Sequence, residues 1–126
     1  MKPQNPIGWF ELYVQDMPRA KKFYEQVFQV ELSPIEIPDA NIEMYGFSQD
    51  MESYGSSGAL IKVEGVPSGG GGTLVYFSCE DCGITAERAK TNGGNIHQEK
   101  MQIGEYGYIC LVIDTEGNMI GLHSLS

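Results

Sequence analysis

Residues 12–28 read Leu-Tyr-Val-Gln-Asp-Met-Pro-Arg-Ala-Lys-Lys-Phe-Tyr-Glu-Gln-Val-Phe, and residues 77–93 read Phe-Ser-Cys-Glu-Asp-Cys-Gly-Ile-Thr-Ala-Glu-Arg-Ala-Lys-Thr-Asn-Gly. In both stretches an apolar strand pattern runs into an aspartate, a short turn and an amphipathic helix. Asp16 and Asp81 are 65 positions apart, about half of the 126-residue chain. The repeat is one of pattern more than of letters. It predicts a pseudo-symmetric domain with a cavity between its halves, where function should be sought.

Each half is expected to have the order strand, helix and three further strands. Asp16 is expected to cap the first helix, with Pro18 in its first turn, and Asp81 to cap the second helix. The Asn92-Gly93-Gly94 sequence is typical of a helix end, and 114–118 of a tight hairpin turn. The apolar runs predict strands at 8–15, 30–37, 42–47, 59–63, 73–79, 95–100, 106–113 and 119–124.

The glycine-rich segment 65–72 predicts a flexible linker between the two halves. A phosphate-binding loop is disfavoured because no Gly-Lys-Ser/Thr follows and the segment leads into a strand. We therefore expect one domain over residues 1–126. It comprises a first module at about 7–64, the linker at 65–72 and a second module at about 73–125.

The composition excludes several classes of function. The formal net charge is −9 and the sequence pI is near 4.5, which argues against a nucleic-acid partner because phosphate binding needs clustered Lys and Arg. No apolar run approaches the roughly 18 residues of a membrane span. The first residues, Met-Lys-Pro-Gln-Asn-Pro, contain no hydrophobic signal core. These features predict a cytoplasmic location.

The three cysteines predict free thiols, since their number is odd. Cys79-Glu-Asp-Cys82 has the spacing of a redox or zinc motif. However, no second pair exists, and the two acidic residues between the sulfurs would raise the thiol pKa. We expect Cys79 to lie in the core at a strand end and Cys82 to lie in a loop.

Three features together resemble the vicinal oxygen chelate superfamily, which includes glyoxalase I, bleomycin-resistance proteins and extradiol dioxygenases. They are the strand-Asp-helix start with Phe23-Tyr24, Gly93-Gly94 after the second helix, and Asp114-Thr-Glu-Gly-Asn-Met-Ile-Gly-Leu near the end. The resemblance covers the chain from about Gly8 to Ser124. It implies an α+β fold of two β-α-β-β-β modules whose curled mixed sheets form a cleft. It also implies, for the enzymes, a divalent metal held by His and Glu residues on the first and last strands of each module.

Counting along the resembling motifs places three of the metal-ligand positions at Trp9, Leu74 and Gly121. The fourth lies on the 59–63 strand in an undefined register, where no side chain is a suitable ligand. Trp, Leu and Gly do not coordinate divalent cations through their side chains, so we expect no metal site and no cofactor. His97 is expected at the periphery. His123 is expected to face the cleft, either making one local hydrogen bond or contacting a ligand.

Strand alternation directs Phe10, Leu12 and Val14 under the first helix, and Val75, Phe77 and Cys79 under the second. The opposite faces then line the cleft, together with Tyr108, Cys110 and Val112 of a later strand and Gly121 of the last. The predicted ligand-binding residues are Trp9, Glu11, Tyr13, Leu74, Tyr76, Ser78, Tyr108, Met119 and His123. Aromatic faces with a few polar groups suit a flat or partly apolar small molecule, although the same aromatics could simply fill the cleft.

Three functions follow as hypotheses. The first is a metal-free small-molecule binding protein of the glyoxalase/bleomycin-resistance type, acting by sequestration or resistance. The second is a lyase, isomerase or dioxygenase-type enzyme with an atypical metal set, or with Glu11 and His123 as acid and base. The third is a dimeric interaction module, since members of the superfamily that the chain resembles commonly dimerise. A small hydrophobic or aromatic ligand and a homodimer are therefore the expected partners.

Overall fold

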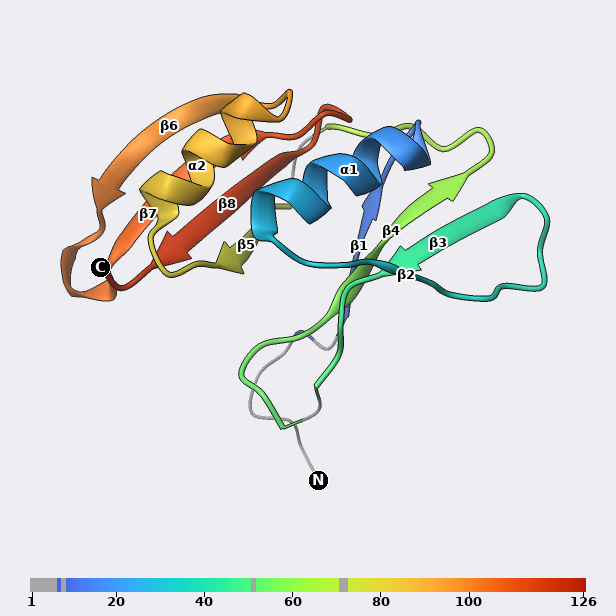
Figure 1. Cartoon of the computed structure of the whole chain (residues 1–126), viewed down its shortest axis with the longest axis horizontal. Helices are drawn as coiled ribbons and strands as arrows, with labels where there is room; N and C mark the ends of the chain where they lie inside the picture. The colour runs from blue at the N-terminus through green and yellow to red at the C-terminus, as the bar shows by residue number, and fades with distance from the viewer. Residues whose placement is uncertain (1–6, 8, 51, 71–72) are drawn as a thin grey trace.

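The computed structural model of the chain describes residues 7, 9–50, 52–70 and 73–126. The predicted order of one strand, one helix and three strands occurs twice, as the sequence analysis predicted (Figure 1). The first module comprises β1 (Phe10–Tyr13), α1 (Met17–Phe28), β2 (Ser33–Pro34), β3 (Ile42–Gly46) and β4 (Gly58–Val63). The second comprises β5 (Val75–Ser78), α2 (Cys82–Thr91), β6 (Asn95–Gln102), a short 3₁₀ helix (Gly104–Tyr106), β7 (Tyr108–Ile113) and β8 (Met119–Ser124).

Each module forms a four-stranded mixed sheet with the same topology. The strand orders are β1-β4-β3-β2 and β5-β8-β7-β6. In both sheets the first strand of the module pairs in parallel with the last, and the remaining pairs are antiparallel. The fold is therefore of the predicted α+β class, with two β-α-β-β-β modules.

Both helices begin at the predicted aspartates. The Asp16 carboxylate accepts a hydrogen bond from Arg19 N, and the Asp81 carboxylate accepts one from Gly83 N. The two cap residues have nearly the same backbone conformation, with φ and ψ of −132° and 101° at Asp16 and −143° and 108° at Asp81. These side chains satisfy N–H groups that have no partner within the helix. The repeat is thus preserved in local geometry as well as in pattern.

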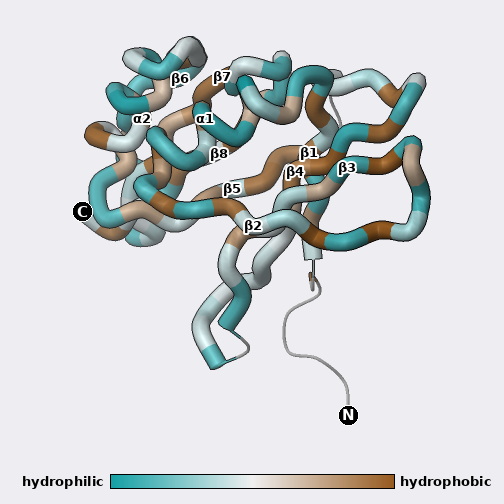
Figure 2. The backbone as a smooth tube through the Cα atoms, turned by 45° about the vertical axis from the view of Figure 1, so that its right-hand side comes forward, coloured by the Kyte–Doolittle hydropathy of each residue, from teal (hydrophilic) through white to brown (hydrophobic). Residues whose placement is uncertain are grey.

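The two modules share one hydrophobic core, which lies between the helices and one face of each sheet. The helices contact each other, and buried residues from both modules form a single cluster. Hydrophobic residues follow β1, β4 and β5 through the middle of the molecule (Figure 2). Aromatic rings join the modules, because Phe77 of β5 stacks on Phe28 of α1 with ring centroids 4.5 Å apart. We call the sheet face on the core side the inner face and the opposite face the outer face.

Two predicted elements differ from the structure. The strand expected at 30–37 is reduced to β2, Ser33–Pro34, at the sheet edge. Proline lacks the N–H group that a longer ladder would need, and Pro38 follows closely. Cys82 was predicted to lie in a loop. Instead, it is the first residue of α2 and is fully buried. Because Asp81 caps the helix directly before it, the Cys82 side chain faces the core.

The described part of the linker, 65–70, is anchored to the second module. Ser68 Oγ donates to the Glu116 carbonyl at 2.6 Å, and Gly69 N donates to Asn118 Oδ1 at 2.7 Å. Gly71 and Gly72 lie outside the described residues. Among the described residues, no helix has the length and apolarity needed to cross a membrane.

Candidate functional site

The predicted alternation of β1 and β5 is confirmed. Leu12 and Val14 are buried on the inner face, so Trp9, Glu11 and Tyr13 lie on the outer face. Phe77 packs against the core in the same way, which leaves Leu74, Tyr76 and Ser78 on the outer face of β5. Three of these outward residues are large and well exposed: Trp9 at 41%, Leu74 at 37% and Tyr76 at 48%. Each sheet therefore presents aromatic and apolar side chains away from the core.

The predicted orientation of β7 is wrong. Cys110 and Val112 are fully buried in the core, and Tyr108 packs against it with Lys100 Nζ 4.8 Å from its ring centroid. Tyr108 therefore lies on the inner face. The outward residues of β7, which the sequence analysis missed, are Ile109, Leu111 and Ile113. They pair with His123, Gly121 and Met119 of β8, which do face outward as predicted.

Strand register fixes the fourth position of the superfamily's metal site. Tyr76 lies opposite Gly121 in the β5–β8 pair, and Glu11 lies opposite Ala59 in the β1–β4 pair. Ala59 is therefore the first-module counterpart of Gly121, and its side chain is fully buried. Neither alanine nor glycine can ligate a metal through its side chain.

The ring of Tyr76 covers Gly121, because a Cβ atom built on Gly121 would overlap that ring. The space that a longer side chain would use at this position is thus taken by an aromatic ring. Among the described residues, no three His, Cys, Asp or Glu side chains gather where they could hold a metal ion. The residues present at the four positions do not fit the metal that the superfamily's enzymes use.

Glu11 and His123 have separate hydrogen-bond partners. Trp9, directly before β1, donates from Nε1 to Oε2 of Glu11 in β1 at 3.2 Å. His123 Nε2 lies 2.7 Å from the Tyr106 carbonyl oxygen, to which it donates in the Nε2–H tautomer. His123 therefore makes the local hydrogen bond that was one of the two expectations for it. His97 is exposed on β6, at the periphery as predicted.

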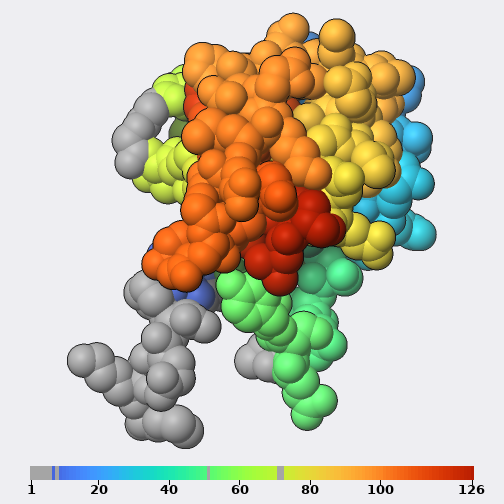
Figure 3. All heavy atoms as spheres, turned by 90° about the vertical axis from the view of Figure 1, so that its left-hand side faces the viewer, coloured from blue at the N-terminus to red at the C-terminus, as the bar shows by residue number. Residues whose placement is uncertain are grey.

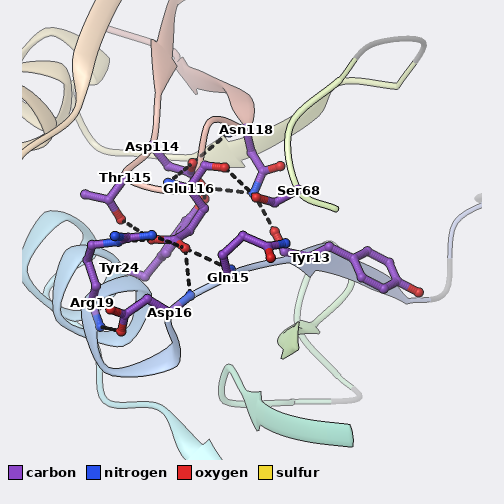
Figure 4. Close-up of polar contacts among 10 residues, drawn as sticks. All are labelled: Tyr13, Gln15, Asp16, Arg19, Tyr24, Ser68, Asp114, Thr115, Glu116 and Asn118. Carbon is purple, nitrogen blue, oxygen red and sulfur yellow. Dashed lines mark hydrogen bonds and ion pairs between the residues drawn. The ribbon is translucent and has the colours of Figure 1, made fainter. Parts of the chain in front are cut away.

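The 114–118 turn joins the second module to the start of the first helix (Figure 4). Glu116 Oε1 accepts from Gln15 N at 2.9 Å and from Asp16 N at 3.0 Å. The Arg19 guanidinium donates to both carboxylate oxygens, with Nε 2.7 Å from Oε2 and Nη2 2.9 Å from Oε1. Burial alone would raise the pKa of Glu116, but the bonds from Arg19, the two backbone N–H groups and Thr115 outweigh it and lower the pKa to about 2.

Asp114 organises the same turn from within. Its Oδ1 accepts from Glu116 N and Asn118 N, both at 2.8 Å, and its Oδ2 accepts from the buried Tyr24 hydroxyl at 2.6 Å. Asn118 Nδ2 donates to the Tyr13 carbonyl, while the Tyr13 side chain points away from the cluster (Figure 4). Burial, and then the Asp114 charge, raise the pKa of Tyr24 well above its ordinary value. The turn quoted for the family resemblance therefore holds the two modules together.

The lowered pKa of Glu116 predicts a specific loss of stability in acid. The folded-state pKa of about 2 lies below the value of 4.5 for an unperturbed glutamate. The carboxylate therefore stabilises the fold above pH 4.5, and this contribution disappears as the pH falls through about 2. At about 1.4 kcal/mol per pKa unit, the contribution is on the order of 3 kcal/mol. Urea unfolding measured from pH 7 downward should show it.

The matched control for this pH dependence is Glu116→Gln, which cannot titrate. The stability difference between the natural protein and Glu116→Gln should shrink between pH 4.5 and 2. If both proteins lost stability in parallel over this range, another carboxylate would be responsible. Asp81, whose pKa is lowered by its hydrogen bond with Lys100, would be the first to examine.

Sequence and structure comparisons place the chain among known proteins. The Glyoxalase/Bleomycin resistance protein/Dioxygenase superfamily pattern matches residues 6–122. The chain belongs to this superfamily. A search of curated proteins by sequence found no match.

Several solved structures share the fold. A glyoxalase I mutant from Zea mays is 21% identical with a TM-score of 0.72, over 94% of this chain and 46% of the maize chain. This chain thus spans about half the length of the maize protein. A glyoxylase/bleomycin resistance protein/dioxygenase domain from Frankia is 13% identical with a TM-score of 0.71, over 98% of this chain and 100% of that one. A hypothetical protein from S. aureus is 16% identical with a TM-score of 0.65, over 96% and 97%. At these identities, the likeness shows the fold alone.

Proposed function

We propose that this member of the superfamily is a metal-free protein that binds a small, flat and partly apolar molecule on its outer sheet faces. The observation that carries the proposal is the set of residues at the four metal-ligand positions, which are Trp9, Ala59, Leu74 and Gly121. The way in which the modules pair does not change this set of residues. A second copy of the chain would contribute the same four residue types to a shared cleft, so no pairing supplies metal ligands.

The exposed side chains on these faces support small-molecule binding. Trp9 on the first sheet, and Leu74 and Tyr76 on the second, are large apolar or aromatic side chains that are partly exposed and available to a ligand. Trp9 and Tyr76 supply flat apolar area, while Glu11 and the Tyr76 hydroxyl supply polar groups that orient a ligand. The net charge of −9 favours neutral or cationic ligands over anions.

We further propose that a homodimer completes the cleft. The outward residues belong to two separate sheets, whose inner faces pack on the same core. An outer face with a half-exposed tryptophan or tyrosine gives a ligand one wall, whereas small-molecule sites usually enclose most of the ligand surface. The outer face of a second copy would supply the other wall. The molar mass in solution, measured by light scattering, tests this part of the proposal.

Trp9, the only tryptophan, gives the proposal a direct test. Planar aromatic amines should quench Trp9 fluorescence and raise the melting temperature, because they bind the native state. Trp9→Ala should weaken binding about tenfold or more, given the apolar area an aromatic ring contributes. Tyr54→Ala removes an aromatic side chain that is 92% exposed in the β3–β4 loop and should leave binding, followed by the melting temperature, unchanged.

Two results would contradict the proposal. One is stoichiometric zinc, nickel, iron or manganese in protein purified without chelators, since the four positions offer no ligands. The other is an equal loss of binding in Trp9→Ala and Tyr54→Ala, which would mean that the aromatic probes bind without regard to the outer face.

A further inference from the structure

A cavity lies where the β5–α2 corner meets the end of α1. Its volume is about 400 Å³, which is within the usual range for small-molecule sites of about 300–1,000 Å³. The segment following α1 (cyan) lies beside the β5–α2 segment (yellow) in Figure 3. The cavity is lined by Phe28, Gln29, Ser78, Cys79, Glu80, Asp81, Ile84, Thr85 and Arg88.

The internal repeat shows what this cavity corresponds to. A shift of 65 positions maps its lining onto Gly93, Gly94, Tyr13, Val14, Gln15, Asp16, Arg19, Ala20 and Phe23. These are the residues around the 114–118 turn, which we call the turn socket. Glu116 bonds to the socket at Gln15, Asp16 and Arg19, and Asn118 to Tyr13. A Cβ on Gly93 would lie 3.2 Å from the Thr115 methyl group. The cavity is therefore the second-module counterpart of an occupied socket.

The two corners share an equivalent backbone hydrogen bond. Val14 N donates to the carbonyl of Ile61 at 2.9 Å, and its counterpart Cys79 N donates to the carbonyl of His123 at 2.8 Å. The next two N–H groups point at Glu116 in the first module. In the second module they belong to Glu80 and Asp81, and neither has a hydrogen-bond partner among residues 7, 9–50, 52–70 and 73–126. Both residues line the cavity, and their N–H groups are the counterparts of the two that hold Glu116.

The corresponding turn of the first module does not fill the second-module cavity. The loop between β3 and β4 is longer than the 114–118 turn, is mostly hydrophilic and extends away from both helices (Figures 1 and 2). It nevertheless keeps the same local motif. Glu52 N donates to Asp50 Oδ1 at 3.0 Å, as Glu116 N donates to Asp114 Oδ1 at 2.8 Å. The carboxylate that would match Glu116 therefore lies in an exposed loop.

We propose that the cavity binds a small organic carboxylate with an apolar body. Its carboxylate would accept hydrogen bonds from Glu80 N and Asp81 N, as Glu116 does from Gln15 N and Asp16 N. Arg88 lines the cavity and supplies positive charge; its Nε donates to the Val27 carbonyl, and its Nη1 has no partner within the described part of the chain. The apolar body would pack on Phe28 and Ile84.

Neighbouring charges set the expected strength of binding. The Glu80 and Asp81 carboxylates oppose an anion, although Lys100 Nζ pairs with Asp81 at 3.0 Å. Ile84 occupies the place of Arg19, so the cavity lacks the guanidinium that holds Glu116. Hydrogen bonds from a charged donor contribute more than those from neutral N–H groups. Because the cavity lacks this guanidinium, we expect the natural protein to bind a carboxylate only in the millimolar range.

Benzoate, followed by amide NMR shifts in about 0.15 M salt, tests the proposal directly. It should shift the Glu80 and Asp81 amide signals in a saturable way, and benzyl alcohol, which has no carboxylate, should not. Ile84→Arg restores the counterpart of Arg19 and should tighten benzoate binding about tenfold or more. Ile84→Gln, which is polar but uncharged, should bind benzoate no more tightly than the natural protein.

Three results would overturn the proposal. Equal shifts with benzoate and benzyl alcohol would show an apolar cavity without carboxylate recognition. Unchanged Glu80 and Asp81 signals in Ile84→Arg at millimolar benzoate would show that the corner does not bind the group. Shifts of these signals caused by Glu52→Gln, without added benzoate, would show that the chain's own loop occupies the cavity in solution.

Discussion

Replacing Glu116 with alanine is expected to lower the free energy of unfolding by about 3 kcal/mol. The carboxylate is fully buried, and it accepts hydrogen bonds from Gln15 N, Asp16 N and Arg19. Alanine would leave two backbone N–H groups at the module junction without their acceptor. The Arg19 side chain is 51% exposed and can turn to water, which limits the loss. Urea unfolding with linear extrapolation gives the measurement.

Two control variants separate the causes of this loss. Glu116→Gln retains an oxygen for the two backbone N–H groups but loses the charge that pairs with Arg19, so it should be intermediate. Glu43→Ala removes an exposed glutamate from β3 and should change stability by no more than about 0.5 kcal/mol. If Glu116→Ala matched Glu43→Ala, the junction between the modules would be held by apolar packing alone.

The sequence predicted the orientation of a strand where a polar residue interrupts its apolar run. In β1 and β5, Glu11 and Ser78 break the apolar runs and so mark which side faces the core. In β7 the run Ile-Cys-Leu-Val-Ile has no polar residue, so alternation cannot assign its two faces. Only the pairing of Cys110 with the buried Leu122 does so, and that pairing is a property of the folded sheet.

The candidate site was predictable only in part, for the same reason. Counting along the chain located Trp9, Leu74 and Gly121, but Ala59 required the register of β4 against β1. The covering of Gly121 by Tyr76 depends on a contact between strands far apart in sequence. The hydrogen-bond partners of Glu116 lie about a hundred positions away in the sequence. No pattern within 114–118 identifies these partners. A hairpin turn was therefore predicted, and its role as a junction was not.

Replacing Gly94 with alanine is also expected to cost about 3 kcal/mol of stability. Gly94 is buried where α2 ends, and its N–H donates to the Ala89 carbonyl at 2.9 Å. An added Cβ would lie 2.6 Å from the Ile113 carbonyl oxygen, 2.9 Å from Phe23 Cε1 and 3.1 Å from the Ala89 carbonyl oxygen. The two oxygens belong to the backbone, and Phe23 is 1% exposed in the core, so the methyl group could fit only by moving α2 away from its sheet and from α1.

Gly83→Ala is the matched control, because it makes the same change in the same module. Its Cβ would meet Lys100 Cδ at 3.2 Å, and this flexible side chain can move aside. Alanine also favours a helix over glycine by up to about 1 kcal/mol, so Gly83→Ala should be neutral or stabilising. In urea, the unfolding midpoint of Gly94→Ala should therefore fall. The midpoint of Gly83→Ala should rise or stay the same. If Gly94→Ala were as stable as the natural protein, the end of α2 could move away from β7 and Phe23 at little cost. The close approach of the two modules at this point would then not be required for folding.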